Sequence, residues 1–108
     1  MSLEKINDMP ALQKGLENSG KVLLMKNSTT CPISHNAFSE YQKFAQDQEA
    51  VLYYLNVQEA RPLSNEIAEM YGVKHESPQV LLFEQGHVTW TTSHWSITYG
   101  ALQEQFNK

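Results

Sequence analysis

The chain has 108 residues, of which 41% are hydrophobic, and a formal net charge of −4. This length supports one domain over residues 1–108, because two cores would each bury too little apolar surface to offset the entropy of ordering their chain. The eight lysines and arginines are scattered, which excludes a nucleic-acid footprint, and no apolar run is long enough to cross a membrane.

Apolar residues at three- and four-residue steps predict a first helix near the start of the chain. The stripe consists of Ile6, Met9, Leu12 and Leu16. Asn7 or Asp8 is placed to cap this helix, and Gly20 is placed to end it. The nearly unbroken apolar run 21–26 that follows is typical of a central strand covered on both faces.

The second predicted helix begins at Pro32, the residue type best tolerated in a first helical turn. Its apolar stripe consists of Ile33, Ala37, Phe38, Tyr41, Phe44 and Ala45. Segment 51–57 is rich in β-branched and aromatic residues and predicts a second buried strand. A helical crossover of this length would place it parallel to the first strand.

A third helix, a hairpin and a closing helix complete the pattern. The third helix has Leu63, Ile67, Met70 and Tyr71 on its apolar face and ends at Gly72. Segments 79–83 and 88–92 flank a short connection containing Gly86, which suits a hairpin turn. The closing helix carries Ile97, Leu102 and Phe106, with Ser96 as its candidate cap. The order α-βαβ-α-ββ-α predicts an α/β thioredoxin-like fold, with a four-stranded mixed sheet flanked by helices.

Cys31 is the only cysteine and lies at the predicted cap of the second helix. Free backbone N–H groups and the positive end of the helix dipole favour the thiolate there. Helix-terminal cysteines reach pKa values of about 3.5 to 7.5, against about 8.5 for a free thiol. Single cysteines are often merely small buried residues, but the polar loop 27–30 before this one favours exposure. We therefore expect Cys31 to be a redox nucleophile.

A lone cysteine forms no internal disulfide, as is usual for proteins of a reducing compartment. The start of the chain also lacks the apolar stretch of a secretory signal. Both observations predict a cytoplasmic protein.

Ser34, three residues after Cys31, decides which redox cycle is available. A hydroxyl can donate a hydrogen bond to a thiolate but cannot resolve a mixed disulfide. The spacing therefore predicts a monothiol cycle that is completed by an external thiol.

Ser77 and Pro78 directly precede the third predicted strand. Because proline cannot donate a hydrogen bond to a sheet, it marks either a strand start or a special turn here.

The segment Thr30-Cys31-Pro32-Ile33-Ser34 resembles the active-site motif of the monothiol bacilliredoxins, which are thioredoxin-like proteins. The resemblance covers nearly the whole chain, including segments 65–68, 72–79 and 93–95. It implies removal of bacillithiol from protein mixed disulfides formed under oxidative stress, in which Cys31 attacks the bacillithiol sulfur and releases the protein thiol.

The resemblance also implies roles for the neighbouring residues. Pro32 and Ser34 complete the motif, and Pro78 is the cis-proline that faces the thiol. The backbone of Ser77 would then pair with an extended substrate, as one more strand does.

The same resemblance implies bacillithiol as a co-substrate and no tightly bound cofactor. The expected partners are bacillithiolated cytosolic proteins and either a low-molecular-weight thiol or a disulfide reductase. We expect the protein to be a monomer.

Bacillithiol carries carboxylates, so its site requires fixed donors near Cys31. His94 and Ser96, at the start of the closing helix, are candidates, together with Thr30 in the motif. The alternative for the first two is an ordinary helix cap beside a packed Trp95.

Other polar and aromatic residues have simpler interpretations. His35 either supports the thiolate as a cation or is simply exposed, and Trp90 is interpreted as packing. The four histidines and the cysteine lack metal-ligand spacing, so no metal site is expected. Three acidic residues are interpreted as solvated charges: Glu66, Glu69 and Glu76.

Two alternative functions remain open. Monothiol glutaredoxins share an iron–sulfur cluster between two chains through one cysteine each, so an iron–sulfur carrier is one alternative. The other is a non-catalytic thioredoxin-fold adaptor, in which Cys31 would have an ordinary pKa.

Overall fold

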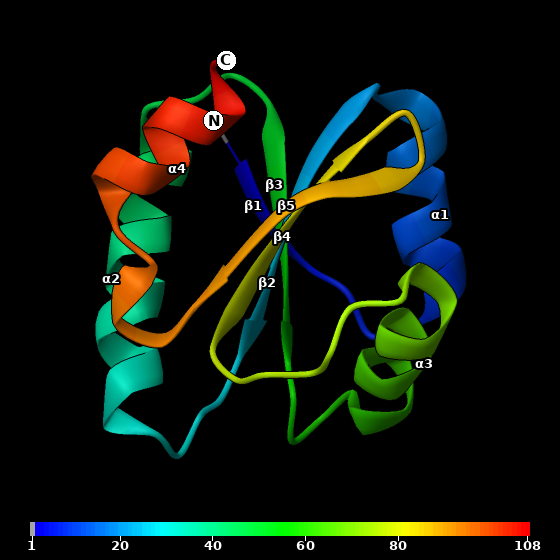
Figure 1. The fold of residues 1–108 in the computed structure, drawn as a ribbon, viewed down its shortest axis with the longest axis horizontal. Helices are drawn as coiled ribbons and strands as arrows, with labels where there is room; N and C mark the ends of the chain where they lie inside the picture. Colours follow the sequence, from blue (N-terminus) through cyan, green and yellow to red (C-terminus); the bar gives the residue numbers. More distant parts are fainter. Residues whose placement is uncertain (1) are drawn as a thin grey trace.

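The computed structural model describes residues 2–108 and consists of a five-stranded mixed sheet with helices on both faces (Figure 1). Along the chain the elements are β1 (Ser2–Lys5), α1 (Met9–Asn18), β2 (Lys21–Asn27), α2 (Pro32–Gln46), β3 (Val51–Asn56), α3 (Arg61–Tyr71), β4 (Gln79–Glu84), β5 (His87–Ser93), the 3-10 turn η1 (His94–Ser96) and α4 (Tyr99–Phe106). The strand order is β1-β3-β2-β4-β5. Strands β1, β3 and β2 are parallel, and β4 and β5 form an antiparallel hairpin beside β2.

The predicted thioredoxin-like α/β architecture is confirmed, but the sheet has five strands rather than the predicted four. Strand β1 pairs in parallel with β3 at the edge of the sheet, with Leu3 opposite Leu52. A strand of four residues with one large apolar side chain, Leu3, carries no alternation that reveals it in the sequence. The residues before α1 therefore extend the sheet rather than the helix.

The helix boundaries agree with the sequence except at the starts of α1 and α4. Ile6, predicted on the first helix, lies before α1, and its N–H donates to the Tyr54 carbonyl oxygen at 2.9 Å. Of the two candidates for the α1 cap, Asp8 is the one used, since its carboxylate accepts a hydrogen bond from the Ala11 N–H at 3.0 Å. Gly72 ends α3 in the left-handed conformation, with a φ of 67°. The prediction that Ser96 caps α4 is wrong, because the cap is Thr98, whose hydroxyl accepts from the Ala101 N–H at 3.2 Å.

The sheet separates two apolar layers. Helices α1 and α3 cover one face, and α2 and α4 cover the other (Figure 1). Leu24 and Ile67 are fully buried in the first layer, whereas Met25 and Phe44 are fully buried in the second. Successive residues of β2 thus point into different layers, as expected for a central strand.

Tyr41 fixes helix α2 on the sheet. Its side chain is fully buried, and its hydroxyl lies 3.0 Å from the Leu23 carbonyl oxygen and 2.7 Å from that of Tyr53. The helix that begins next to Cys31 is therefore held against both central strands.

Within residues 2–108, no helix is long and apolar enough to span a membrane.

Lys26 is a charged residue of β2 that follows four consecutive apolar residues. It is fully buried, and burial lowers its pKa to about 8 from the ordinary 10.5. Between these two pH values the unfolded chain holds a proton at Lys26 that the folded chain has lost. Folding stability therefore increases with pH over this interval.

We predict that the free energy of unfolding of the wild type, minus that of Lys26→Met, increases between pH 8 and 10.5 by at most about 1.4 kcal/mol per pH unit. Urea denaturation at several pH values measures it, and groups that titrate in both proteins cancel in the difference. A difference that does not change with pH would show that the amine is solvated in the folded protein.

Candidate active site

Cys31 occupies the N-cap of α2, as the sequence predicted. Its backbone is extended, with φ −109° and ψ 124°, and Pro32 is the first helical residue. The side chain is half-buried. The sulfur is thus partly accessible at the end of a helix whose first N–H groups have no partner within the helix.

The pKa of Cys31 lies below that of an ordinary thiol. The backbone N–H of Ser34, which stabilises the thiolate, is the largest cause. The N–H of Ile33 and the hydroxyl of Ser34 act in the same direction, and partial burial opposes them. The start of α2 therefore favours the nucleophilic form of the thiol.

Ser34 is fully buried, which separates it from an ordinary surface hydroxyl. Its hydroxyl oxygen accepts a hydrogen bond from the Ser28 N–H at 3.3 Å. One side chain thus connects the loop before Cys31 to the helix after it, and its own proton remains free for the sulfur.

Gln58 holds the loop before Cys31, a role that the sequence did not reveal. Its amide oxygen accepts from the Thr29 N–H at 3.1 Å. Its amide nitrogen donates to the hydroxyl of Ser28 at 2.8 Å and to that of Thr30 at 3.2 Å. Three consecutive loop residues are therefore fixed by one side chain that follows β3.

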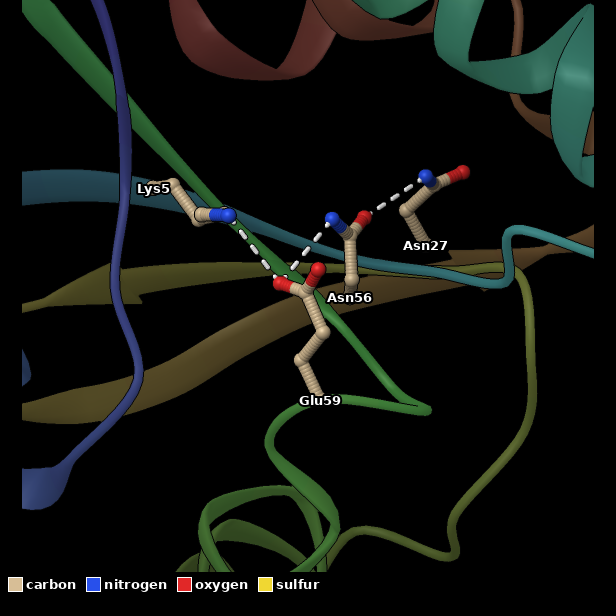
Figure 2. Close-up of polar contacts among 4 residues, drawn as sticks. All are labelled: Lys5, Asn27, Asn56 and Glu59. Carbon is tan, nitrogen blue, oxygen red and sulfur yellow. Dashed lines mark hydrogen bonds and ion pairs between the residues drawn. The ribbon is translucent and has the colours of Figure 1, made fainter.

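A second polar network joins the carboxyl ends of the three parallel strands (Figure 2). The amide nitrogen of Asn27 donates to the Asn56 side-chain oxygen at 2.9 Å. Glu59 then accepts from Asn56 at 3.4 Å and from Lys5 at 3.0 Å. The network ties the end of β2, which leads to Cys31, to the ends of β3 and β1.

The Ser77–Pro78 peptide bond is cis, the isomer that the family resemblance implied. Lys26 pairs with Gln79 across the antiparallel strands β2 and β4, so the residues before β4 lie at the same end of the sheet as those after β2. Pro78 is buried, and the hydroxyl of Ser77 is buried without a hydrogen-bond partner within residues 2–108. The register therefore brings Pro78 and the loop before Cys31 to the same end of the sheet.

Turn η1, which directly follows β5, lies at the same end of the sheet. The His94 N–H donates to the Pro78 carbonyl oxygen at 3.1 Å, and η1 packs against α2. His94 has a φ of 53°, and its Nδ1 lies 3.9 Å from a carboxylate oxygen of Glu76. His94 and Ser96 are both exposed. Ser96 caps no helix, because the cap of α4 is Thr98.

The neighbouring tryptophan and histidine side chains differ in how far they are exposed to solvent. Trp95 is 67% exposed, so the alternative interpretation of a packed Trp95 is wrong, whereas Trp90 packs against the α2 and α4 layer. His35 is exposed. Among residues 2–108, no group of three metal-ligating side chains is close enough to hold an ion.

We predict that Gln58→Ala increases the hydrogen-exchange rate of the Thr29 amide about fivefold, because one hydrogen bond contributes about 1 kcal/mol. Exchange followed by NMR measures this rate. Gln42→Ala, which removes an exposed glutamine of α2, is the matched control. Equal Thr29 exchange in both variants would show that Gln58 does not hold the loop in solution.

Comparison with known proteins agrees with this geometry. Residues 3–102 match the family described as monothiol bacilliredoxin BrxC. The solved structure of a proposed oxidoreductase with a thioredoxin fold has a TM-score of 0.91 and 36% identity, covering 98% of this chain and 94% of the other.

More distant structures share the fold alone. A mutant thioredoxin from Halobacterium salinarum NRC-1 has a TM-score of 0.80 and 17% identity, covering 98% of this chain and 88% of the other. The reduced thioredoxin pre-protein of Schistosoma mansoni has a TM-score of 0.78 and 15% identity, covering 99% and 97%. All three structures show the thioredoxin-like fold. The family match and the 36%-identical structure establish that this chain belongs to the monothiol bacilliredoxin family BrxC.

Proposed function

We propose that this protein is a monothiol thiol-disulfide oxidoreductase that removes bacillithiol from protein mixed disulfides. The observation that carries the proposal is the position of its single cysteine at the start of α2, where backbone N–H groups lower the pKa of Cys31. Family membership supports the choice of bacillithiol as the group transferred.

The proposed reaction is one thiol-disulfide exchange. The Cys31 thiolate attacks the bacillithiol sulfur of the mixed disulfide, a new sulfur–sulfur bond forms, and the old one breaks. The electron pair leaves with the protein sulfur, which takes a proton from solvent and becomes a thiol. Cys31 is left bacillithiolated, so no net oxidation or reduction occurs in this step.

Residues beside Cys31 have separate roles in the proposal. Ser34 stabilises the thiolate through its backbone N–H and its hydroxyl. Pro32 starts the helix, and because proline has no backbone N–H it leaves no donor without an acceptor there. Because Ser34 is not a thiol, the bacillithiolated Cys31 waits for an external reductant.

In this proposal the substrate binds at the end of the sheet where Pro78 and η1 lie. The backbone of Ser77 would pair with the peptide around the mixed disulfide. His94 and Ser96, both exposed, would donate hydrogen bonds to the carboxylates of bacillithiol, and Thr30 would contribute its hydroxyl.

The second half of the cycle needs a partner. A low-molecular-weight thiol or a disulfide reductase would attack the mixed disulfide at Cys31 and restore the thiolate. The protein substrates would be bacillithiolated proteins of the cytoplasm, where reducing conditions keep a single cysteine free.

Mass spectrometry tests the proposal. The purified protein is mixed with a bacillithiolated model protein, and the bacillithiol adduct is expected on Cys31, with the model protein recovered as its thiol. Cys31→Ala is expected to acquire no adduct. No transfer to the wild type, together with slow alkylation of Cys31, would contradict the proposal and favour the adaptor or the iron–sulfur carrier.

A second variant tests the monothiol cycle. In Ser34→Cys a thiol replaces the hydroxyl three residues after Cys31, so the adduct should be released as free bacillithiol while an internal disulfide forms. Persistence of the adduct in this variant would show that position 34 does not face the Cys31 sulfur.

A further inference from the structure

Lys26 is a buried cation that the exchange reaction does not use. It is fully buried in β2 and forms no ion pair with a carboxylate within residues 2–108. Its Nζ donates to the Ser64 carbonyl oxygen at 3.0 Å and lies 3.2 Å from the His75 Nδ1. Buried lysines are rare unless paired.

His75 is the second member of this cluster and belongs to the segment that leads to Pro78. Its Nδ1 also lies 3.1 Å from the Ser64 hydroxyl. The cluster therefore joins three parts of the fold, which are β2 through Lys26, α3 through Ser64 and the segment 72–78 through His75.

The protonation states fit a Lys26-to-His75 hydrogen bond. Burial, the Lys26 charge and then the Arg61 charge lower the pKa of His75, and only Glu76 opposes them. Neutral His75 can accept at Nδ1, whereas Lys26, with a pKa of about 8, remains a donor at neutral pH. At neutral pH the positive charge therefore lies on Lys26, and His75 is its neutral acceptor.

Gln79 holds the same segment from its other end. It lies opposite Lys26 in the sheet register, and its side chain is buried. The amide nitrogen donates to the Lys74 carbonyl oxygen at 2.9 Å, and the amide oxygen accepts from the Glu76 N–H at 3.4 Å. The residues before Ser77 are thus fixed on both sides of His75.

An apolar side chain of similar length would fill this space without desolvating a charge. Replacing buried ionic groups with apolar ones often leaves stability unchanged or raised. Packing alone therefore does not account for a lysine at this position, whereas the need to hold the segment 74–78 does.

We propose that Lys26 and His75 are positioning residues for thiol exchange, because their hydrogen bond fixes the segment 74–78 and so places the Ser77 backbone beside Cys31 to receive the substrate. This inference depends on the function proposed above. Within residues 2–108 the hydrogen bonds of the two side chains go to Ser64 and to each other rather than to Cys31, so they would act through the position of Ser77.

The test compares His75→Ala with His75→Asn in single-turnover transfer from a bacillithiolated model protein. Asparagine presents an amide oxygen where Nδ1 lies, so it keeps an acceptor for Lys26, whereas alanine removes it. We expect transfer to His75→Ala to be about 10- to 100-fold slower than wild type, the cost of a misplaced binding group. We expect His75→Asn to retain most of the wild-type rate.

Alkylation of Cys31 by iodoacetamide separates positioning from loss of the fold. This small reagent needs no Ser77 backbone, so its rate and pH midpoint should be the same in wild type and His75→Ala. Lys26→Met removes the same bond, so its effect on transfer should not add to that of His75→Ala in the double variant.

Three results would overturn the inference alone while the wild type transfers bacillithiol. These are a wild-type transfer rate in His75→Ala, a rate in His75→Asn as low as in His75→Ala, and equal losses of transfer and alkylation. Absence of transfer in the wild type would instead overturn the proposed function, and the inference with it.

Discussion

The chemistry of this protein depends on backbone N–H groups at the start of α2 that point toward the sulfur of Cys31. The N–H groups of Ser34 and Ile33 have no partner within the helix, and together they lower the pKa of the thiol. The helix must therefore begin at this cysteine. Pro32 provides that start, and Tyr41 holds the helix on the two central strands.

Around this point, the loops of the site are fixed by buried or bridging polar side chains from elsewhere in the chain. Gln58 holds the three residues before Cys31. Asn27 joins that loop to the ends of the neighbouring strands (Figure 2). Lys26 and His75 hold the segment before Pro78. The segments on either side of Cys31 and Pro78 are thus held by hydrogen bonds to the sheet and to α3, as precise positioning of a site requires.

The sequence predicted those structural features that depend on residues close together in the chain. Pro32 and the apolar stripe behind it locate the start of α2, and Gly72 locates the end of α3. The edge strand around Leu3 was missed because it is too short to alternate. Ser96 and Thr98 have similar capping hydroxyls, but Ser96 lies inside η1, and Thr98 directly precedes α4. Gln58 was missed because its partners lie about thirty residues away in the sequence, where no spacing rule applies.

The pH dependence of single-turnover bacillithiol transfer to Cys31 tests whether the thiolate at the start of α2 is the nucleophile. If the thiolate held by α2 is the nucleophile, the transfer rate rises with pH to a midpoint below about 8.5 and then levels off, in parallel with alkylation of Cys31. A transfer rate that is still rising through a pH of about 8.5, as expected for a free thiol, would show that the start of α2 does not lower the pKa of Cys31.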